Sequence, residues 1–520
     1  MSVASLLPAR PAKDLRPIAL GALVAFAALV GGIGAANLSP TGRALRILGL
    51  VVILLPLILR AIPAAGVVVL VLMATLVEQL PVPLPQFGGI GTDQIFYFTS
   101  LNDGIGIGGV LATPLELTMA MILATWAVRA IGSHSWRLRK SQLLPVVAIL
   151  MGIILVAAAR GLLQGADLRT DLREIRPWVY VGVAYLIASQ LLHGREAVWA
   201  VLWAFVIGAG IKGTQGTLRF FSLDLHPRPD YIISHEEAFF LTLFLLLTAT
   251  LWIFGERGRL RQVATTFLPL VLLADLANAR RTAWVIFGAG FIALVVIAWI
   301  RLPQRRSLIR RGAFVLVVAS LIYLPVFWSS TAIWAEPARA IKSSVFPDQR
   351  DRDSNVYRQL ENANLLADIK ASTPIGTGFG IPIDYSAIPF HDLSDQVPAL
   401  RFVPHNGVLY IWMVLGIPGA LAFWWLIGST VVLAGRVIRA PDRRLAIFGA
   451  FSVCAVIAYL MEGYYDFGLW WFRVALLMGC LLGALEAALH ASPDPLRNAA
   501  VRRHDDAGRP TAAEHAGGAL

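Results

Sequence analysis

Cysteine and charged residues are both scarce in this chain. Its 520 residues include two cysteines, Cys454 and Cys480, and both lie inside apolar stretches. This position excludes a disulfide framework, a cysteine-based zinc site and an iron–sulfur cluster. Charged residues make up 15% of the chain against about 25% in soluble domains, while 57% of the residues are apolar. These proportions exclude a soluble enzyme and indicate a membrane protein.

Apolar runs close to the length of a membrane-spanning helix recur along almost the whole sequence. They predict an all-α, polytopic membrane bundle of about 12–14 transmembrane helices. The predicted spans cover residues 18–36, 45–59, 62–80, 112–131, 143–159, 177–192, 196–213, 236–254, 263–277, 283–300, 312–329, 406–430, 445–462 and 468–489. The first run reads as a signal anchor, because many further spans follow it. The short pair at 45–59 and 62–80 could instead form a re-entrant hairpin, which gives the lower count.

The distribution of arginine and lysine predicts the orientation of this bundle. The chain carries 44 Lys and Arg against 32 Asp and Glu, a net charge of +12. Alternate loops hold most of this excess, and basic loops are typical of the cytoplasmic side of a membrane. Both termini are therefore expected to be cytoplasmic, and the charge does not imply nucleic acid as a partner. The basic loops contain Arg137, Arg139 and Lys140; Arg257, Arg259 and Arg261; Arg301, Arg305, Arg306, Arg310 and Arg311; and Arg436, Arg439, Arg443 and Arg444.

This topology divides the chain into five segments. Residues 1–17 form a cytoplasmic N-terminus, residues 18–329 and 406–490 form the two parts of the transmembrane bundle, and residues 491–520 form a polar tail that we expect to be disordered. Between the two parts of the bundle, residues 330–405 form a long outer loop with short helices. Because long connections often carry function, this loop is a candidate region for the site.

Arginines on the outer side are informative, because the orientation of the bundle gives no reason for them. Arg280 and Arg281 occupy a tight turn between two spans, and paired guanidiniums suit bidentate binding of phosphate oxygens. The alternative is contact with lipid headgroups. Arg219 lies in a second outer loop, where an interfacial role is again the alternative. His235 and Glu236 in that loop are a candidate acid–base pair, although carboxylates also favour helix N-termini.

Three aspartates in the long loop have a spacing that resembles a divalent-metal site. They are Asp348, Asp351 and Asp353. Arg350 and Arg352 alternate with them and would repel a cation that needs several oxygen ligands. We therefore expect no metal here, and predict a self-neutralising, solvated turn.

The end of the same loop contains a helical pattern and a glycine-rich strip. Apolar residues recur with a helical period over 355–370, with Arg358 and Glu361 on the flank of that helix. This pattern predicts a helix that lies over the bundle. The strip at 373–380 follows, but no strand precedes it, so its spacing is weak evidence for phosphate binding.

The sharpest single feature is the His405-Asn406 pair at the start of the span 406–430. A neutral imidazole at the mouth of a bundle can accept a proton near physiological pH, so His405 is a candidate general base. The alternative is structural, with Asn406 as the helix cap and His405 as a flanking residue.

Together these segments resemble a known family. His405-Asn406 is followed after nine residues by Gly416 and, two residues further, by Gly419. This spacing is similar to the signature of the O-antigen ligase and polymerase superfamily. The resemblance extends over about 205–420. Two upstream segments resemble the same family: residues 280–284, which read Arg-Arg-Thr-Ala-Trp, and the combination of Arg358 with the strip 373–380.

The resemblance implies an inverting, metal-independent glycosyltransferase of the bacterial inner membrane that uses no cofactor. Its donor would be a glycan on undecaprenyl diphosphate, taken at the periplasmic face, and its acceptor a glycan, a lipid or a protein. His405 would be the base that acts on the acceptor hydroxyl. The candidate diphosphate ligands are Arg280, Arg281, Arg219 and Arg358, and the alternative bases are His235 and Glu236.

A transporter of lipid-linked glycans is the main alternative, because it would also cross the membrane and bind a diphosphate. Transporters typically place ionisable residues near the bilayer midplane, and Glu78, Arg129 and Asp275 lie within or near span ends. The candidate residues above gather instead at one surface, which favours an enzyme. Polymerase, ligase and protein O-oligosaccharyltransferase differ in their acceptor, and the sequence does not distinguish them.

Overall fold

The computed structural model describes residues 58–59, 61–79, 97–106, 108–132, 138–223, 232–372, 374–388 and 398–492. These residues form helices and connecting loops, with no strand among them, and the predicted all-α bundle is confirmed. The predicted span 18–36, most of 45–59 and nearly all of the polar tail lie outside the described residues.

The predicted spans from 62–80 onward each coincide with a helix. Nine helices in the described part are long and apolar enough to cross a membrane, and α3 and α9 are shorter apolar helices. α7 begins at Leu168 instead of the predicted 177, because its first turns are charged and could not be recognised from apolar content. The helices of the bundle are α3 (Ala65–Leu76), α5 (Pro114–Gly132), α6 (Leu144–Leu163), α7 (Leu168–Leu191), α8 (Gly194–Ser222), α9 (Glu237–Ile253), α10 (Arg259–Ala277), α11 (Arg281–Arg301), α12 (Arg306–Phe327), α15 (Gly407–Ile438), α16 (Arg443–Tyr465) and α17 (Phe472–Ala491).

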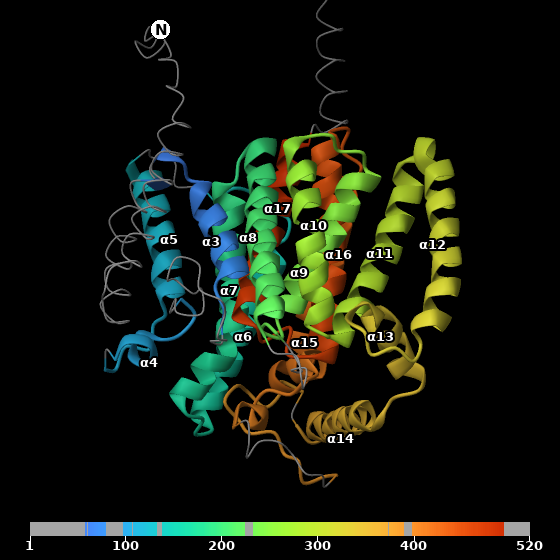
Figure 1. Cartoon of the computed structure of the whole chain (residues 1–520). Coiled ribbons are helices and arrows are strands. Elements are labelled where there is room, and N and C mark those ends of the chain that lie inside the picture. Colours follow the sequence, from blue (N-terminus) through green and yellow to red (C-terminus); the bar gives the residue numbers. More distant parts are fainter. Residues whose placement is uncertain are drawn as a thin grey trace, which may run out of the picture.

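Short elements gather at one end of this bundle. Figure 1 shows α4, α13 and α14 at that end, and the connection between α11 and α12 at the other. We call the first the α14 end. The loop 330–405 contributes most of these elements, with η4 (Ile333–Ala335), α13 (Glu336–Val345), α14 (Gln349–Ala371) and η5 (Pro398–Arg401), while α4 (Leu101–Ile105) comes from an earlier connection.

Arginines at the opposite end satisfy backbone carbonyls where helices finish. Arg301 donates hydrogen bonds to the carbonyls of Ile438 and Ala440, at 2.8 and 3.0 Å, just where α15 ends. Arg305 donates to the carbonyl of Ile253 in the last turn of α9, at 3.0 Å. The last carbonyls of a helix have no partner within it, and a nearby cation also favours the negative end of the helix dipole. Arginines of the basic loops therefore stabilise helix ends, in addition to indicating the orientation of the bundle.

Close contact between α8 and α10 aligns two loops at the α14 end. Gly213 of α8 faces Val271 of α10 so closely that a Cβ at Gly213 would lie 2.5 Å from Val271 Cγ2. Small residues at a helix interface allow the backbones to approach in this way. The ends of α8 and α10, which carry Arg219 and the Arg280–Arg281 turn, consequently lie at the same end of the bundle.

The orientation can be tested with cysteine labelling. Asp353 in α14 and Arg306 at the start of α12 are both exposed, and they lie at opposite ends of the bundle. We expect Asp353→Cys to react with a membrane-impermeant thiol reagent in intact cells, and Arg306→Cys to react after the membrane is opened. Background labelling should be low, because both native cysteines are buried. The reverse pattern would invert the topology and move the α14 end into the cytoplasm.

Candidate active site

His405 is held by a carboxylate from the helix that crosses the end of the bundle. Glu361 of α14 accepts a hydrogen bond from the His405 backbone N–H at 3.0 Å, and His405 Nδ1 lies 3.2 Å from each Glu361 carboxylate oxygen. The Glu361 side chain is completely buried, and the His405 side chain is 17% exposed. A carboxylate at Nδ1 favours the tautomer with its proton there, which leaves Nε2 as the proton acceptor.

The two sequence-based interpretations of the His405-Asn406 pair are compatible in the structure. Asn406 caps α15, because its side chain accepts a hydrogen bond from the backbone N–H of Leu409 at 3.1 Å. His405 precedes the cap and lies close to two aromatic rings. Its ring centroid is 4.5 Å from that of Phe467 and 5.5 Å from that of Tyr357. Capping fixes the backbone, and the carboxylate and rings fix the imidazole.

Asp466, in the turn between α16 and α17, is the centre of a charged cluster around His405. Burial alone would raise the pKa of Asp466, but neighbouring guanidinium and imidazole groups outweigh it and hold that pKa below its ordinary value. Asp466 is therefore an anion at neutral pH. The groups that act on it are His405, Arg358, His235 and Arg280, which come from four separate segments of the chain.

Two further members of this cluster differ in charge. Burial, followed by the nearby Arg280 guanidinium, lowers the pKa of His235 to about 4, so its imidazole is neutral at pH 7. Glu462 of α16 is buried within electrostatic range of Arg280 and Arg358. Among the described residues, Glu462 Oε2 and Arg358 Nε are buried without a hydrogen-bond partner. The cluster thus combines two guanidiniums and two imidazoles with acidic side chains.

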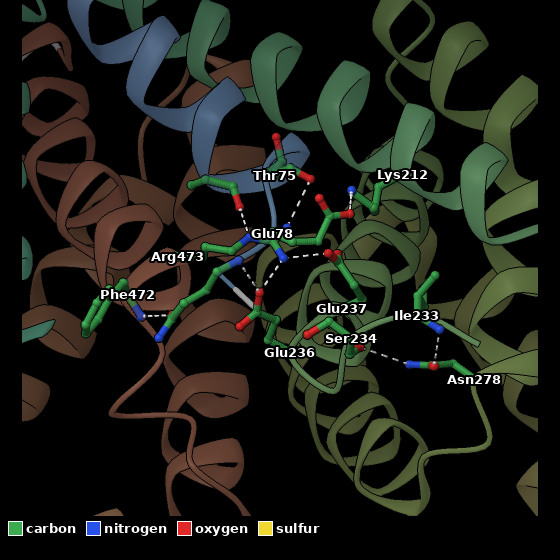
Figure 2. Close-up of polar contacts among 12 residues, drawn as sticks. Thr75, Glu78, Lys212, Ile233, Ser234, Glu236, Glu237, Asn278, Phe472 and Arg473 are labelled. Carbon is green, nitrogen blue, oxygen red and sulfur yellow. Dashed lines mark hydrogen bonds and ion pairs between the residues drawn. The ribbon is translucent and has the colours of Figure 1, made fainter. Parts of the chain in front are cut away.

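Asn278 connects the turn that carries His235 to the turn that carries Arg280. Its side chain accepts a hydrogen bond from the Ile233 N–H at 3.2 Å and donates to the Ser234 carbonyl at 3.4 Å (Figure 2). Ala279 then adopts φ 52°, a left-handed conformation that costs about 1–2 kcal/mol for a residue with a Cβ. This tight turn allows α11 to begin at Arg281 so soon after α10 ends, and it orients the arginine pair.

Glu236 has a different environment from His235. Arg473 at the start of α17 lies 2.5 Å from a carboxylate oxygen of Glu236 and 2.5 Å from one of Glu237, and all three side chains are fully buried (Figure 2). Glu78 forms a buried ion pair with Lys212 beside them. Glu236 is therefore part of a buried ionic network that joins α3, α8, α9 and α17. Glu78, named above under the transporter alternative, belongs to the same network.

The arginine pair divides between two environments. Arg280 belongs to the charged cluster, whereas Arg281 lies 3.3 Å from Asp351 in the first turn of α14 and 3.5 Å from the Ser343 hydroxyl. Arg358 projects from α14 into the cluster. Arg219 was predicted in an outer loop, but α8 continues to Ser222, so Arg219 is half-buried in the last turn of that helix at the same end of the bundle.

The aspartate run is helical, so the predicted turn is wrong, whereas Asp348 and Asp353 are exposed to solvent as predicted. α14 begins at Gln349 instead of the predicted 355, with Asp348 as its N-cap accepting a hydrogen bond from the Asp351 N–H at 2.9 Å. Asp353 accepts hydrogen bonds from the Gln349 side chain one turn away. Acidic residues in a first helical turn favour the positive end of the helix dipole. No group of three or more potential metal ligands occurs among the described residues.

The glycine strip pairs with an unwound turn of α15. Pro418 has no N–H and α15 is kinked at Gly416, so carbonyls in this turn lose their helical partners. The strip replaces them: Thr377 N–H donates to the Met413 carbonyl at 2.9 Å and Gly378 N–H to the Val414 carbonyl at 3.1 Å. In return the Pro374 carbonyl accepts from the N–H of Ile417 at 2.8 Å. The strip thus uses these N–H groups to position α15, not to bind phosphate.

Gly416 is the position where this contact requires glycine. Its φ is +65°, and a Cβ would lie 2.2 Å from the Pro374 carbonyl oxygen. We expect Gly416→Ala to lower the unfolding temperature markedly, because it adds left-handed strain to a clash between two backbones. Gly428→Ala in the same helix is the control, because nothing lies within 4 Å of its Cβ. Equal melting temperatures for the two variants would contradict this account.

The sequence analysis did not identify the acidic residues of the site, which are Glu361, Glu462 and Asp466. Glu361 was recognised only as a residue on a helix flank, and Glu462 and Asp466 were not singled out. A signal was present, since two acidic residues near the end of an apolar span are costly unless they have a function or a partner.

The central part of the chain matches a known family. Residues 264–424 match the family model described as O-antigen ligase, and no curated protein matches the chain. The matched region begins in α10 and includes the Arg280 turn, the crossing helix α14, the glycine strip and His405. The resemblance found in the sequence is therefore confirmed for residues 264–424, which are similar to the O-antigen ligase family.

Proposed function

We propose that this protein is an inverting glycosyltransferase that moves or polymerises a glycan from an undecaprenyl-diphosphate carrier at the periplasmic face of the bacterial inner membrane. The observation that supports this most strongly is the pairing of His405 with buried Glu361 beside Arg280 and Arg358. A base oriented by a carboxylate, next to guanidiniums, suits transfer of a group away from a diphosphate.

In the proposed reaction, His405 Nε2 takes the proton of an acceptor hydroxyl. The hydroxyl oxygen forms a bond to the anomeric carbon from the face opposite the diphosphate, and the bond from that carbon to the diphosphate oxygen breaks. Configuration at the anomeric carbon is thereby inverted, and undecaprenyl diphosphate leaves with the electron pair. The buried Glu361 carboxylate would stabilise the imidazolium that forms on His405.

Arg280 and Arg358 are the proposed ligands of the leaving diphosphate. Guanidiniums bind phosphate oxygens in bidentate fashion, and they act strongest on charge that develops in a site shielded from water. Glu462 and Asp466 would hold them in place before the donor arrives. Arg219 is proposed as an outer contact to the donor, and Arg281, which pairs with Asp351, is proposed to contribute little to donor binding. His235, neutral and inside the cluster, is the alternative base ahead of Glu236, which is engaged by Arg473.

The protein is proposed to work without a metal ion or a cofactor, because arginines supply the charge that a divalent cation would otherwise supply. The test is glycan transfer by purified protein in lipid nanodiscs, with an undecaprenyl-diphosphate-linked oligosaccharide as donor and EDTA present. We expect turnover in EDTA and inversion at the anomeric carbon. Turnover that requires Mg²⁺ or Mn²⁺ would contradict the metal-independent mechanism, and a product of retained configuration would contradict the single displacement.

The acceptor is proposed to be a glycan, a lipid or a protein. A deletion strain separates these, because loss of polymerisation, loss of attachment to a lipid core and loss of protein glycosylation give different patterns on a gel. A deletion strain that loses transport of the lipid-linked glycan but keeps glycan transfer would favour the alternative function, a transporter of lipid-linked glycans.

A further inference from the structure

A cavity lined by three arginines lies beside the candidate active site. Its volume is about 310 Å³, near the lower limit of typical small-molecule sites, which span roughly 300–1,000 Å³. Arg169, Arg173 and Arg176 line one side of it. They are spaced by four and three residues in the first turns of α7, so they share one face of that helix. This is the charged extension of α7 that the apolar pattern did not predict.

The lining of this cavity is positively charged. Its three arginines face one acid, Asp103 of α4, which pairs with Arg169. Arg176 lies 2.8 Å from Glu116 of α5. Arg173 instead rests its guanidinium carbon 5.0 Å from the ring centroid of Trp470, and the acid that acts on it is its neighbour in α7, Glu174.

Neutral groups in the lining suit a sugar. The rings of Phe98, Trp470 and Phe472 offer flat apolar faces, and Ser100, Thr99 and Gln79 offer polar atoms.

A row of aromatic rings joins this cavity to His405. The Trp470 ring lies 5.7 Å from Trp471, Trp471 lies 6.1 Å from Phe467, and Phe467 lies 4.5 Å from the His405 imidazole. The α16–α17 turn that carries these rings also carries Asp466 of the charged cluster. One short turn therefore borders both the cavity and the candidate base.

We propose that this cavity is the acceptor subsite, and that it binds a phosphate or carboxylate group on the saccharide whose hydroxyl receives the glycan. This rests on the proposed function, since it assigns the second substrate of the same reaction. Arg173 would bind the anion, helped by the field of Arg169 and Arg176, and Trp470 would contact the sugar. The anionic headgroup of a bilayer phospholipid has the same chemistry, so the test must separate the two sources.

The test is photocrosslinking from within the cavity. Leu172 lines it and can be replaced with a photoreactive phenylalanine derivative in cells that make their normal envelope glycans. Mass spectrometry of the irradiated, purified protein then identifies what is attached. We expect an adduct that contains an anionic saccharide. Adding Arg173→Gln should lower its yield about tenfold or more, the effect of losing a charge-assisted hydrogen bond, and Arg173→Lys should lower it less.

Arg261→Gln is the matched control, because Arg261 also lies over a tryptophan, 4.5 Å from the Trp252 ring, but at the opposite end of the bundle. It should leave the adduct unchanged. A phospholipid as the sole adduct, an adduct that does not depend on Arg173, or no adduct would each overturn the proposal. A failure of the proposed function is seen separately, because it would appear as normal glycan transfer by His405→Ala, whatever adduct forms at Leu172.

Discussion

His405→Ala should reduce glycan transfer by about 10²–10⁴-fold while donor binding stays nearly unchanged, because a positioned general base contributes roughly that factor to turnover. His405 has the geometry for this effect: its Nδ1 is 3.2 Å from buried Glu361, and its imidazole contacts the rings of Phe467 and Tyr357. The measurement is a single-turnover rate at saturating donor, together with equilibrium binding of the lipid-linked donor.

Asn406→Ala is the control for the structural interpretation of this pair. It removes the cap of α15 and should cost about 0.5–2 kcal/mol of stability, while the base remains. If Asn406→Ala and His405→Ala impair transfer equally, and by no more than their loss of folded protein, His405 is a flanking residue. The base would then be sought first at His235, which shares the cluster.

The spans were predictable because each depends on local sequence. A membrane helix needs a continuous apolar run, and basic residues in the adjoining loops mark where that run ends. Both signals can be read without knowing which helices pack together. The start of α7 at Leu168 was missed for the same reason, since that segment projects beyond the apolar run. The start of α14 was missed although Asp348 and Asp351 have the spacing of a helix cap, because their alternation with arginines suggested a solvated turn.

The partners of the acidic side chains in the site could not be predicted, because these pairings depend on contacts between distant segments. Glu361 meets His405 across 44 positions of sequence, and Asp466 approaches Arg280 and His235 from another pair of helices. No local pattern carries this information. The role of the glycine strip could not be predicted either, because it depends on α15. The kink of α15 at Gly416 leaves carbonyls without helical partners, and N–H groups of the strip donate to them.

Arg280 and Arg281 are adjacent in sequence but have different environments, so their variants can be compared directly. Arg280 lies in the charged cluster, and Arg281 pairs with Asp351 in a partly exposed ion pair. Arg280→Ala should weaken donor binding by roughly 1.5–3 kcal/mol for each charge-assisted hydrogen bond lost. It should also slow the chemical step by about 10²–10³-fold, as removal of a group that stabilises developing negative charge does. Donor affinity and single-turnover rate should therefore fall together, unlike in His405→Ala.

Arg281→Ala is the control, because it is adjacent in sequence and removes the same side chain. A partly exposed ion pair contributes roughly 0–1 kcal/mol, so this variant should fold normally and lose little activity. Arg280→Lys keeps the positive charge near Glu462 and Asp466, which protects the fold, but it loses the planar fork that binds two phosphate oxygens. Low activity in a well-folded Arg280→Lys protein would therefore reflect donor recognition and not misfolding. If Arg281→Ala is the more damaging variant, the diphosphate binds on the α14 side of the turn, and Arg280 serves to neutralise the buried acids.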